Sequence, residues 1–502
     1  MTDLNAIVST FSIEEQQQFI KYLEKKNKRN DTKNIQLFTL LVKEEFSSKE
    51  LCKAIYESDN KVAYHALRKR LYQSLIDFIA NTNLEEENSI DMQIIKYILA
   101  SRTFLINKQA KIAYAILEKA EVIAQEHSLF PILNEIYHTK IEYAYLNPSV
   151  DINSLVSEFK TNQKNHYLEE ELNMVYAKIK QTLNDMTYKG QVLDFQTILN
   201  TTLAEHNISL NDSMSFKSLY QLMTIVSISA FVTNDYLKIE PFLLDTYSKI
   251  QTHKLKDKQL YYHIQIVYMI ANTLFRNKKF EASLSHLEQM KSLMELQRKK
   301  HFRAFELKYN LLLSLNLNYN GNQNKAIEHL EDFKQSKHPD TESVLDIQLS
   351  LVMFYIQGSR FKEAQHIFSK FYHTDKYYTE KAGIEWVIKK SLAEIILHIE
   401  LGNIDLVESR LLSFKRNYNS YLKQIHQERV ITYLQLVNQY YKYPESVTTD
   451  TFKNKVEMSF NWIEAKQEDI FVMSFFAWLK SKMENKPLYE TTLQLVEIAQ
   501  KS

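Results

Sequence analysis

Glycine, proline and cysteine are all scarce in this chain. Of its 502 residues, 5 are glycine and 6 are proline, whereas sheet-rich folds need many such residues in their turns. The scarcity therefore favours long helices joined by short corners. The single cysteine, Cys52, excludes an intramolecular disulfide and any zinc or iron–sulfur site built from several cysteines. We expect Cys52 to be a small buried apolar residue rather than a nucleophile.

The chain also lacks an excess of charge of either sign. Its 62 lysine and arginine residues nearly balance its 61 aspartate and glutamate residues, so no overall field attracts nucleic acid or an anionic membrane. The apolar runs are far shorter than the ~20 residues of a membrane span, and the first residues show no basic start followed by an apolar run. We therefore expect a cytoplasmic protein without a membrane partner.

Signals of catalysis are missing as well. The sequence has no glycine-rich phosphate loop, no G-x-S-x-G and no H-E-x-x-H, which are the motifs that bring a nucleophile, a metal or a phosphate into place. The 15 histidines are scattered without the spacing of metal ligands. We therefore expect no enzyme activity, no cofactor and no metal site.

What the chain does contain is a series of helix-start signals in its first part. Ser12 with Glu15 forms a capping box, and a second one begins at Ser47, so that each serine and glutamate satisfy each other's backbone N–H groups. With the apolar spacing, these signals predict helices over about 12–25, 31–41, 47–56 and 60–80. A polar, acidic break follows, so we expect a small helical domain over 1–82 and a second region over 90–502.

Corner signals become regular from about residue 90. Each marker is a glycine, asparagine or proline beside polar residues, and the interval is about 42 residues. The markers are Asn107, Asn147, Gly190, Asn234, Asn277, Gly321, Gly358, Gly402, Pro444 and Asn485. This interval holds two helices of about 16–18 residues with their corners. We therefore expect about ten helical hairpins.

Apolar residues recur at matching places after four of these corners. A small or medium apolar residue comes first, and a larger one follows about four positions later. The small residue lets the two helices of a hairpin approach closely, and the large one fills the groove between hairpins. The small positions are Ala282, Ala326, Ala364 and Val407, with Ala113 in the same place in an earlier unit.

These features resemble the tetratricopeptide repeat family, most clearly over residues 270–412. The resemblance implies an all-α fold in which a right-handed α-α superhelix binds protein segments along its inner face. The interval is longer than the family's roughly 34 residues, and the tryptophan and Leu-Gly of its first helix are missing, so related α-solenoids stay open. In architecture the chain also resembles bacterial peptide-sensing regulators, which pair such an array with a small N-terminal helical domain.

The resemblance places the inner face on the first helix of each hairpin. Tyrosine there offers a large contact area with a polar tip, which suits peptide recognition. Seven residues near the ends of these helices are candidates for contacting a protein or peptide partner: Thr187, Tyr188, Asn318, Tyr319, Tyr355, Gln357 and Glu400. The alternative is that they only end helices and pack on their neighbours. A clamp for a C-terminal carboxylate is not expected, because the equivalent positions include Leu311, Leu315, Leu392 and Ile396.

Our first functional hypothesis is a non-catalytic scaffold or adaptor that binds a protein or peptide in the groove of the array. The identity of this partner stays open. An inner face filled by the chain's own C-terminal helices would count against it.

The alternative is a nucleic-acid-binding regulator whose repeats sense a peptide or partner. Its basis is the short helix, turn and long helix over 48–80, which resemble a helix-turn-helix unit. The basic residues that could contact phosphates are Lys25, Lys26, Lys28, Arg29, Lys61, His65, Arg68 and Lys69. Against this, residues 1–80 carry a net charge of only +2, and base-reading side chains at the start of the helix are missing. A solvated face of a packing domain explains the same residues.

Overall fold

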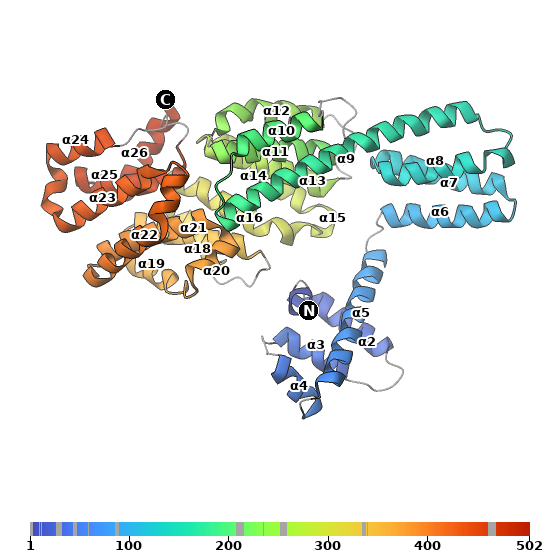
Figure 1. Cartoon of the computed structure of the whole chain (residues 1–502), viewed down its shortest axis with the longest axis horizontal. Coiled ribbons are helices and arrows are strands. Elements are labelled where there is room, and N and C mark those ends of the chain that lie inside the picture. Colours follow the sequence, from blue (N-terminus) through green and yellow to red (C-terminus); the bar gives the residue numbers. More distant parts are fainter. Residues whose placement is uncertain are drawn as a thin grey trace. The chain divides into compact units, whose positions relative to one another are not determined.

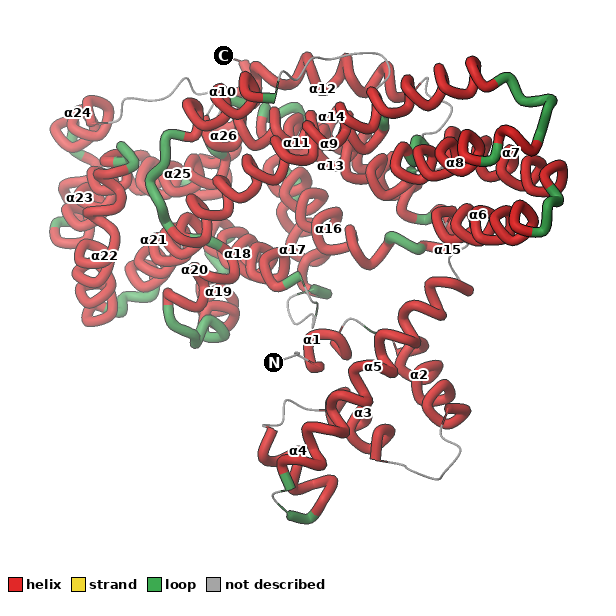
Figure 2. The backbone as a smooth tube through the Cα atoms, turned by 45° about the vertical axis from the view of Figure 1, so that its right-hand side comes forward, coloured by secondary structure: helices red, strands yellow, loops and turns green. Residues whose placement is uncertain are grey.

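The regular elements of this protein are helices. The computed structural model describes residues 4–9, 11, 13–26, 33–43, 48–58, 60–85, 90–206, 215–233, 235–251, 259–333, 338, 340–459 and 468–501. Within these residues it contains helices and no strand (Figure 1, Figure 2). The predicted all-α class is therefore confirmed, and neighbouring helices pack in pairs.

The helices fall into two compact units, Met1–Gln163 and Lys164–Ser502. The division lies inside one long helix, α9 (Ile152–Lys189). The first unit therefore contains the small N-terminal domain that the sequence predicted together with the first helices assigned to the repeat array. The two units have separate buried apolar clusters.

The first unit begins with helices that match the predicted ones. Its elements are α1 (Leu4–Ser9), α2 (Ile13–Lys26), α3 (Lys33–Lys43), α4 (Ser48–Tyr56), α5 (Lys61–Glu85), α6 (Ile90–Ile106), α7 (Ala110–Glu126), α8 (Phe130–Glu142) and η1 (Ala144–Leu146). The four predicted helices are confirmed as α2 to α5. Their core contains a cluster of aromatic rings, in which the ring of Phe19 lies 4.7 Å from that of Phe38 and 5.1 Å from that of Phe78. Cys52 is buried, as expected. Ser12 and Ser47 lie outside the described residues.

The second unit holds the remaining helices. They are α10 (Phe195–Glu205), α11 (Phe216–Thr233), α12 (Tyr236–Gln251), α13 (Leu260–Arg276), α14 (Phe280–Met294), α15 (Leu296–Lys299), α16 (Phe302–Tyr319), α17 (Gln323–Glu331), α18 (Thr341–Gln357), α19 (Phe361–Phe368), α20 (Asp375–Ala382), α21 (Ile384–Glu400), α22 (Ile404–Gln424), α23 (Glu428–Lys442), η2 (Pro444–Thr448), α24 (Asp450–Ser459), α25 (Ile470–Glu484) and α26 (Leu488–Lys501). Packing is most extensive within the hairpins that the corners predicted, such as α13 with α14 and α21 with α22. In addition, α26 packs on α16 and α18, which lie far earlier in the chain.

Seven turns between consecutive helices share one geometry. Each has three residues, its middle residue has a positive φ, and the N–H of its third residue bonds to the carbonyl five residues back. This is the Schellman arrangement, which satisfies the free carbonyl groups at a helix end. The turns are 107–109, 127–129, 277–279, 320–322, 358–360, 401–403 and 425–427. Five of them contain a predicted corner, and those at 127–129 and 425–427 were not predicted. Asn234 lies outside the described residues.

One helix is far longer than the repeat spacing predicted. Between the corners at Asn147 and Gly190, α9 runs through 38 residues without a break. The sequence of this helix contains no glycine or proline, so nothing in it stops the helix. The expected length of about 16–18 residues is therefore wrong for this stretch.

One described helix, α11, is long and apolar enough to cross a membrane by length and composition alone. In the structure it packs against α10, α12 and α13. Its buried residues include Phe216 and Met223, which belong to the main apolar core of the second unit. A core helix explains its composition equally well.

Candidate ligand cavity

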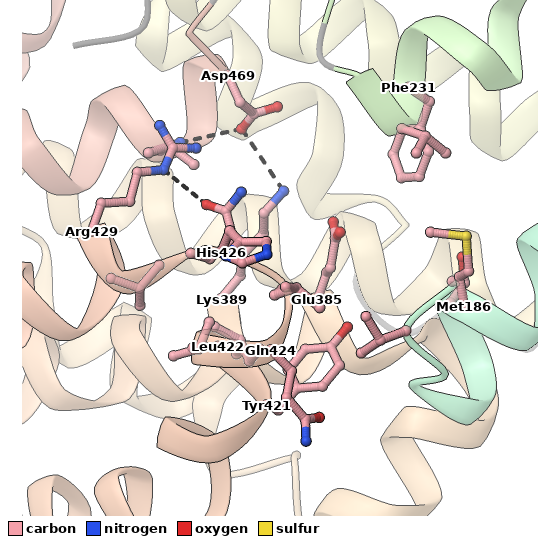
Figure 3. A pocket seen from close by; sticks show the side chains of 18 of the residues that line it. Met186, Phe231, Glu385, Lys389, Tyr421, Leu422, Gln424, His426, Arg429 and Asp469 are labelled. Carbon is pink, nitrogen blue, oxygen red and sulfur yellow. Dashed lines mark hydrogen bonds and ion pairs between the residues drawn. The ribbon is translucent and has the colours of Figure 1, made fainter. Parts of the chain in front are cut away.

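A cavity of about 660 Å³ lies within the second unit (Figure 3). Its wall is formed by the end of α9 and the loop after it, the ends of α11 and α13, the first half of α21, the turn between α22 and α23, and the start of α25. Pockets that bind small ligands typically measure about 300–1,000 Å³. Much of this wall is apolar, with Met186, Phe231 and Leu422 among its side chains.

Close packing between α9 and α21 shapes one side of the cavity. Gly383 precedes α21 with a φ of 90°, and a Cβ atom there would lie 2.7 Å from Cγ2 of Thr187 and 3.1 Å from its carbonyl oxygen. Both the backbone conformation and the lack of space therefore require glycine. This contact holds the end of α9 against the start of α21, so Thr187 and Glu385 line the same cavity.

Asp469, just before α25, holds two cations at the cavity wall. Its carboxylate pairs with Arg276 and lies 3.8 Å from Nζ of Lys389, and it accepts the N–H groups of Phe471 and Val472. Burial alone would raise the pKa of Asp469. The charges of Lys389 and Arg276 and the two N–H groups outweigh burial and hold that pKa well below its usual range. The carboxylate is therefore charged and its partners are in place.

A second ion pair lies beside the first. Nη1 of Arg429 donates to both carboxylate oxygens of Glu468, at 3.0 and 2.8 Å. The backbone carbonyl of Glu468 accepts the ammonium of Lys278 at 2.7 Å, and burial lowers the pKa of Lys278 to about 8. These bonds tie the residues before α25 to α23 and to the turn after α13.

Glu385 differs from Glu468 and Asp469, the two ion-paired carboxylates of the cavity. It is exposed, and within the described part of the chain it has no ion pair. Figure 3 shows its carboxylate pointing into the space between Phe231, Met186 and Tyr421. Burial raises the pKa of Tyr421 to about 12, so that hydroxyl stays protonated at neutral pH and can donate a hydrogen bond. His426, the positive-φ residue of its turn, lines the same cavity.

The seven residues predicted to bind a partner do not gather in this cavity. Thr187 alone among them lines it. The hydroxyl of Tyr188 donates to the carboxylate of Glu342 at 2.9 Å, and that of Tyr355 donates to Glu331. Both tyrosines therefore have partners within the second unit.

Three more of these residues contact the chain's own last two helices. The hydroxyl of Ser474 on α25 lies 3.0 Å from the hydroxyl of Tyr319 and 3.0 Å from Nε2 of Gln357. Tyr489 of α26 donates its hydroxyl to the carbonyl of Asn318 at 2.6 Å. Asn318, Tyr319 and Gln357 are at most 2% exposed. Their burial under α25 and α26 corrects the expectation that they lie on an open inner face.

Glu400, the last of the seven, is engaged in the same way. Nε1 of Trp478 on α25 donates to its carboxylate at 2.5 Å, and Nζ of Lys482 lies 2.6 Å away. Trp478 is 1% exposed, so this contact belongs to the packed interior. Binding of a partner by any of the seven residues stays a prediction.

The basic residues predicted to bind nucleic acid are gathered only in part. Lys61, His65 and Lys69 recur every four positions along α5 and are exposed, so they form one stripe. Arg68 instead donates to the hydroxyl of Tyr64 at 3.3 Å.

The remaining basic residues do not extend this stripe within the described chain. Nζ of Lys26 pairs with Asp77 at 2.8 Å, a bond that raises the pKa of Lys26. Lys25 is exposed at the end of α2. Lys28 and Arg29 lie outside the described residues.

The residues predicted from the sequence lie near the ends of the first helices of the hairpins, so most residues of the cavity were not predicted. The cavity instead uses the start of α21, the turn before α23 and the start of α25. One signal was present, since Glu385 and Lys389 are charged residues four apart in a largely apolar helix, where charges are costly unless they are bonded. Arg276 and Asp469 are 193 residues apart, so only the fold brings them together.

No family model matches the chain, and no curated protein matches it. Within the described ranges, histidine, cysteine, aspartate and glutamate form no group of three or more that could hold a metal ion. The proposals below therefore rest on the geometry of the cavity and of α5.

Proposed function

We propose that the protein is a non-catalytic, cytoplasmic binding protein that takes a short segment of a protein or peptide into the cavity of its second unit. The observation that carries this proposal is the cavity, whose volume is about 660 Å³. Its wall combines apolar side chains with polar ones, of which Asp469 and Glu468 are held in place by ion pairs. Apolar walls with fixed polar groups are typical of ligand sites.

We also propose that the second unit is a tetratricopeptide-like right-handed superhelix with a repeat near about 42 residues. The recurring three-residue turn supports this, because it joins helices in the same way at successive hairpins. The 38-residue α9 and the packing of α26 on α16 and α18 are departures, since each repeat of a linear array contacts only its neighbours.

The segment that binds is proposed to be short. Helix α25 already bonds to Tyr319, Gln357 and Glu400, and α26 bonds to Asn318. These two helices therefore occupy the positions along which a long scaffold groove would run. This occupation counts against a partner laid along the whole inner face. Among the described residues, the cavity beside the first half of α21 stays open.

Peptide selection tests the proposal. The full-length protein is equilibrated with a mixture of capped random hexapeptides, and retained peptides are sequenced after size exclusion. We expect wild type to retain peptides that Val192→Trp does not, because Val192 lines the cavity and is 49% exposed, so a larger ring fills the cavity without disturbing the core. Val122→Trp, at a position of α7 that is 55% exposed, is the matched control. Equal retention by wild type and Val192→Trp would refute the proposal.

Nucleic-acid binding by the first unit is the second candidate function. The observation that favours it is the stripe of Lys61, His65 and Lys69 on α5, next to the short helix α4 and its turn. The side chain of Asn60 caps the start of α5 by accepting the N–H of Ala63 at 3.1 Å. A basic helix presented in this way can contact backbone phosphates.

Fluorescence anisotropy of the full-length protein on a labelled random duplex tests this candidate. If the stripe contacts phosphates, the double substitution Lys61→Ala/Lys69→Ala lowers the slope of log affinity against log salt by about 2, roughly 1 for each lysine lost. The control is Lys415→Ala/Lys442→Ala, at exposed positions of the second unit. Absence of binding at low salt excludes the second candidate.

A further inference from the structure

We infer that the segment taken into the cavity carries a basic side chain, a lysine or an arginine, whose cationic group pairs with Glu385. This inference rests on the function proposed above and adds the chemical class of the ligand. It begins from the carboxylates of the cavity, which are Asp194, Glu385, Glu468 and Asp469.

Three of these four carboxylates already have partners. Asp469 pairs with Arg276 and Lys389, and Glu468 pairs with Arg429. Asp194 caps α10 by accepting the N–H of Thr197 at 3.2 Å. Among the residues that the structure describes, Glu385 is the cavity carboxylate whose side chain forms neither an ion pair nor a hydrogen bond.

The neighbour best placed to neutralise Glu385 is directed elsewhere. Lys389 follows it by four positions on α21, the spacing at which glutamate and lysine usually pair on a helix. Nζ of Lys389 instead lies 3.8 Å from Asp469 and 5.3 Å from the ring centroid of Phe471. Glu385 is therefore left with a negative charge that a ligand can use.

A structural role at the start of α21 is the simplest alternative explanation of Glu385. An acidic residue in the first turn interacts favourably with the helix dipole, and Glu385 is in that turn. This explanation requires no particular direction of the side chain. Figure 3 shows the carboxylate pointing into the cavity, which the helix dipole alone does not explain.

The surroundings of Glu385 suit a cation with an aliphatic stem. Phe231 and Tyr421 line the same space, and aromatic faces attract ammonium and guanidinium groups. Apolar walls such as Met186 and Ile388 can hold the methylene groups of lysine or arginine, whose charged heads then reach a polar partner.

The residue preferences of the retained peptides test this inference. We expect wild type to enrich lysine and arginine over the input mixture, and Glu385→Gln, which keeps the shape of the side chain, to lose that enrichment. For one selected basic peptide, we expect Glu385→Gln to bind roughly 10- to 100-fold more weakly by calorimetry, the effect of losing a hydrogen bond to a charged group. Val122→Trp serves again as the control, and thermal unfolding checks that each variant is folded.

The other outcomes separate the two proposals. Wild type could retain peptides that Val192→Trp does not, and yet show no enrichment of lysine and arginine, or an enrichment that Glu385→Gln leaves unchanged. Either result would overturn this inference and leave the proposed function standing. If wild type retains no more peptide than Val192→Trp does, both the proposed function and this inference are overturned.

Discussion

Two parts of the second unit satisfy their polar groups in opposite ways. Under α25 and α26, the side chains of Tyr319, Gln357 and Ser474 are buried and bonded to one another. In the cavity, Glu385 is exposed and unpaired within the described residues, although it lies four positions from a lysine. Buried hydrogen bonds between helices favour one packed structure, whereas an exposed carboxylate that lines a cavity and has no partner among the described residues is available to a ligand.

This difference between the two parts indicates which residues of the chain are candidates for binding a ligand. A position near the end of a first helix is not enough to make a binding residue, because Glu400 holds such a position and is bonded to Trp478 and Lys482 of α25. Glu385 is different because no cationic side chain of the described helices forms an ion pair with it.

The largest expected effect comes from breaking the packed part. Trp478→Ala removes a side chain that is 1% exposed, so we expect it to lower the free energy of unfolding by about 3–5 kcal/mol. Tyr443→Ala, at a residue that is 66% exposed, is the control and should cost less than about 0.5 kcal/mol. Urea denaturation measures both. Equal effects would show that α25 is not packed as described.

A pH-dependent effect should be next in size. Burial and the charge of Glu342 raise the pKa of Asp346 on α18 to about 7, although Lys389 and Arg276 act to lower it. The folded pKa thus lies above the unfolded value of about 3.9, so the stability contributed by Asp346 is complete below about pH 4 and is lost as pH rises through 7.

Asp346→Asn removes this loss, so its stability relative to wild type should improve between pH 5 and pH 8. We expect the improvement to be about 1–3 kcal/mol, measured by urea denaturation at both pH values. Asp405→Asn, at an exposed residue, is the control and should show no such change. A difference between Asp346→Asn and wild type that is the same at both pH values would contradict the shifted pKa.

The smallest expected difference in stability is between two tyrosine-to-phenylalanine variants, one in each part. Tyr489→Phe removes the hydroxyl that donates to the carbonyl of Asn318 and should cost about 1 kcal/mol. Tyr421→Phe removes a hydroxyl that faces the cavity and should leave stability nearly unchanged. Thermal unfolding of the two variants measures the contrast, and the reverse order of the two effects would contradict it.

Local sequence predicted the helices and several of their turns, because these depend on nearby residues. Gly321 and Gly402 supply the positive φ that a Schellman turn requires, and they were recognised as corners. The turn centred on His426 has the same geometry but was missed, since a positive φ is uncommon in any residue other than glycine, although histidine is enriched there. The unbroken α9 was missed because a regular interval suggested a turn where the sequence contains no stop signal.

The cavity depended on contacts that no local pattern contains. Asp469 and Arg276 come from helices far apart in the chain, and the fit of Gly383 against Thr187 joins two other distant segments. The covering of Tyr319 by α25 is equally non-local. Sequence could therefore suggest an inner face, but not which part of that face the chain itself would fill.

The rate of thiol labelling tests the central contrast most directly. Single cysteines are introduced by Ser474→Cys, a nearly isosteric change at a 1% exposed position, and by Glu385→Cys in the cavity, both in a Cys52→Ser background. We predict that maleimide labels the Glu385→Cys variant rapidly. The Ser474→Cys variant should be labelled only at the rate at which α25 opens or the protein unfolds. Equally rapid labelling of both variants would show that α25 does not seal the inner face and would contradict the account.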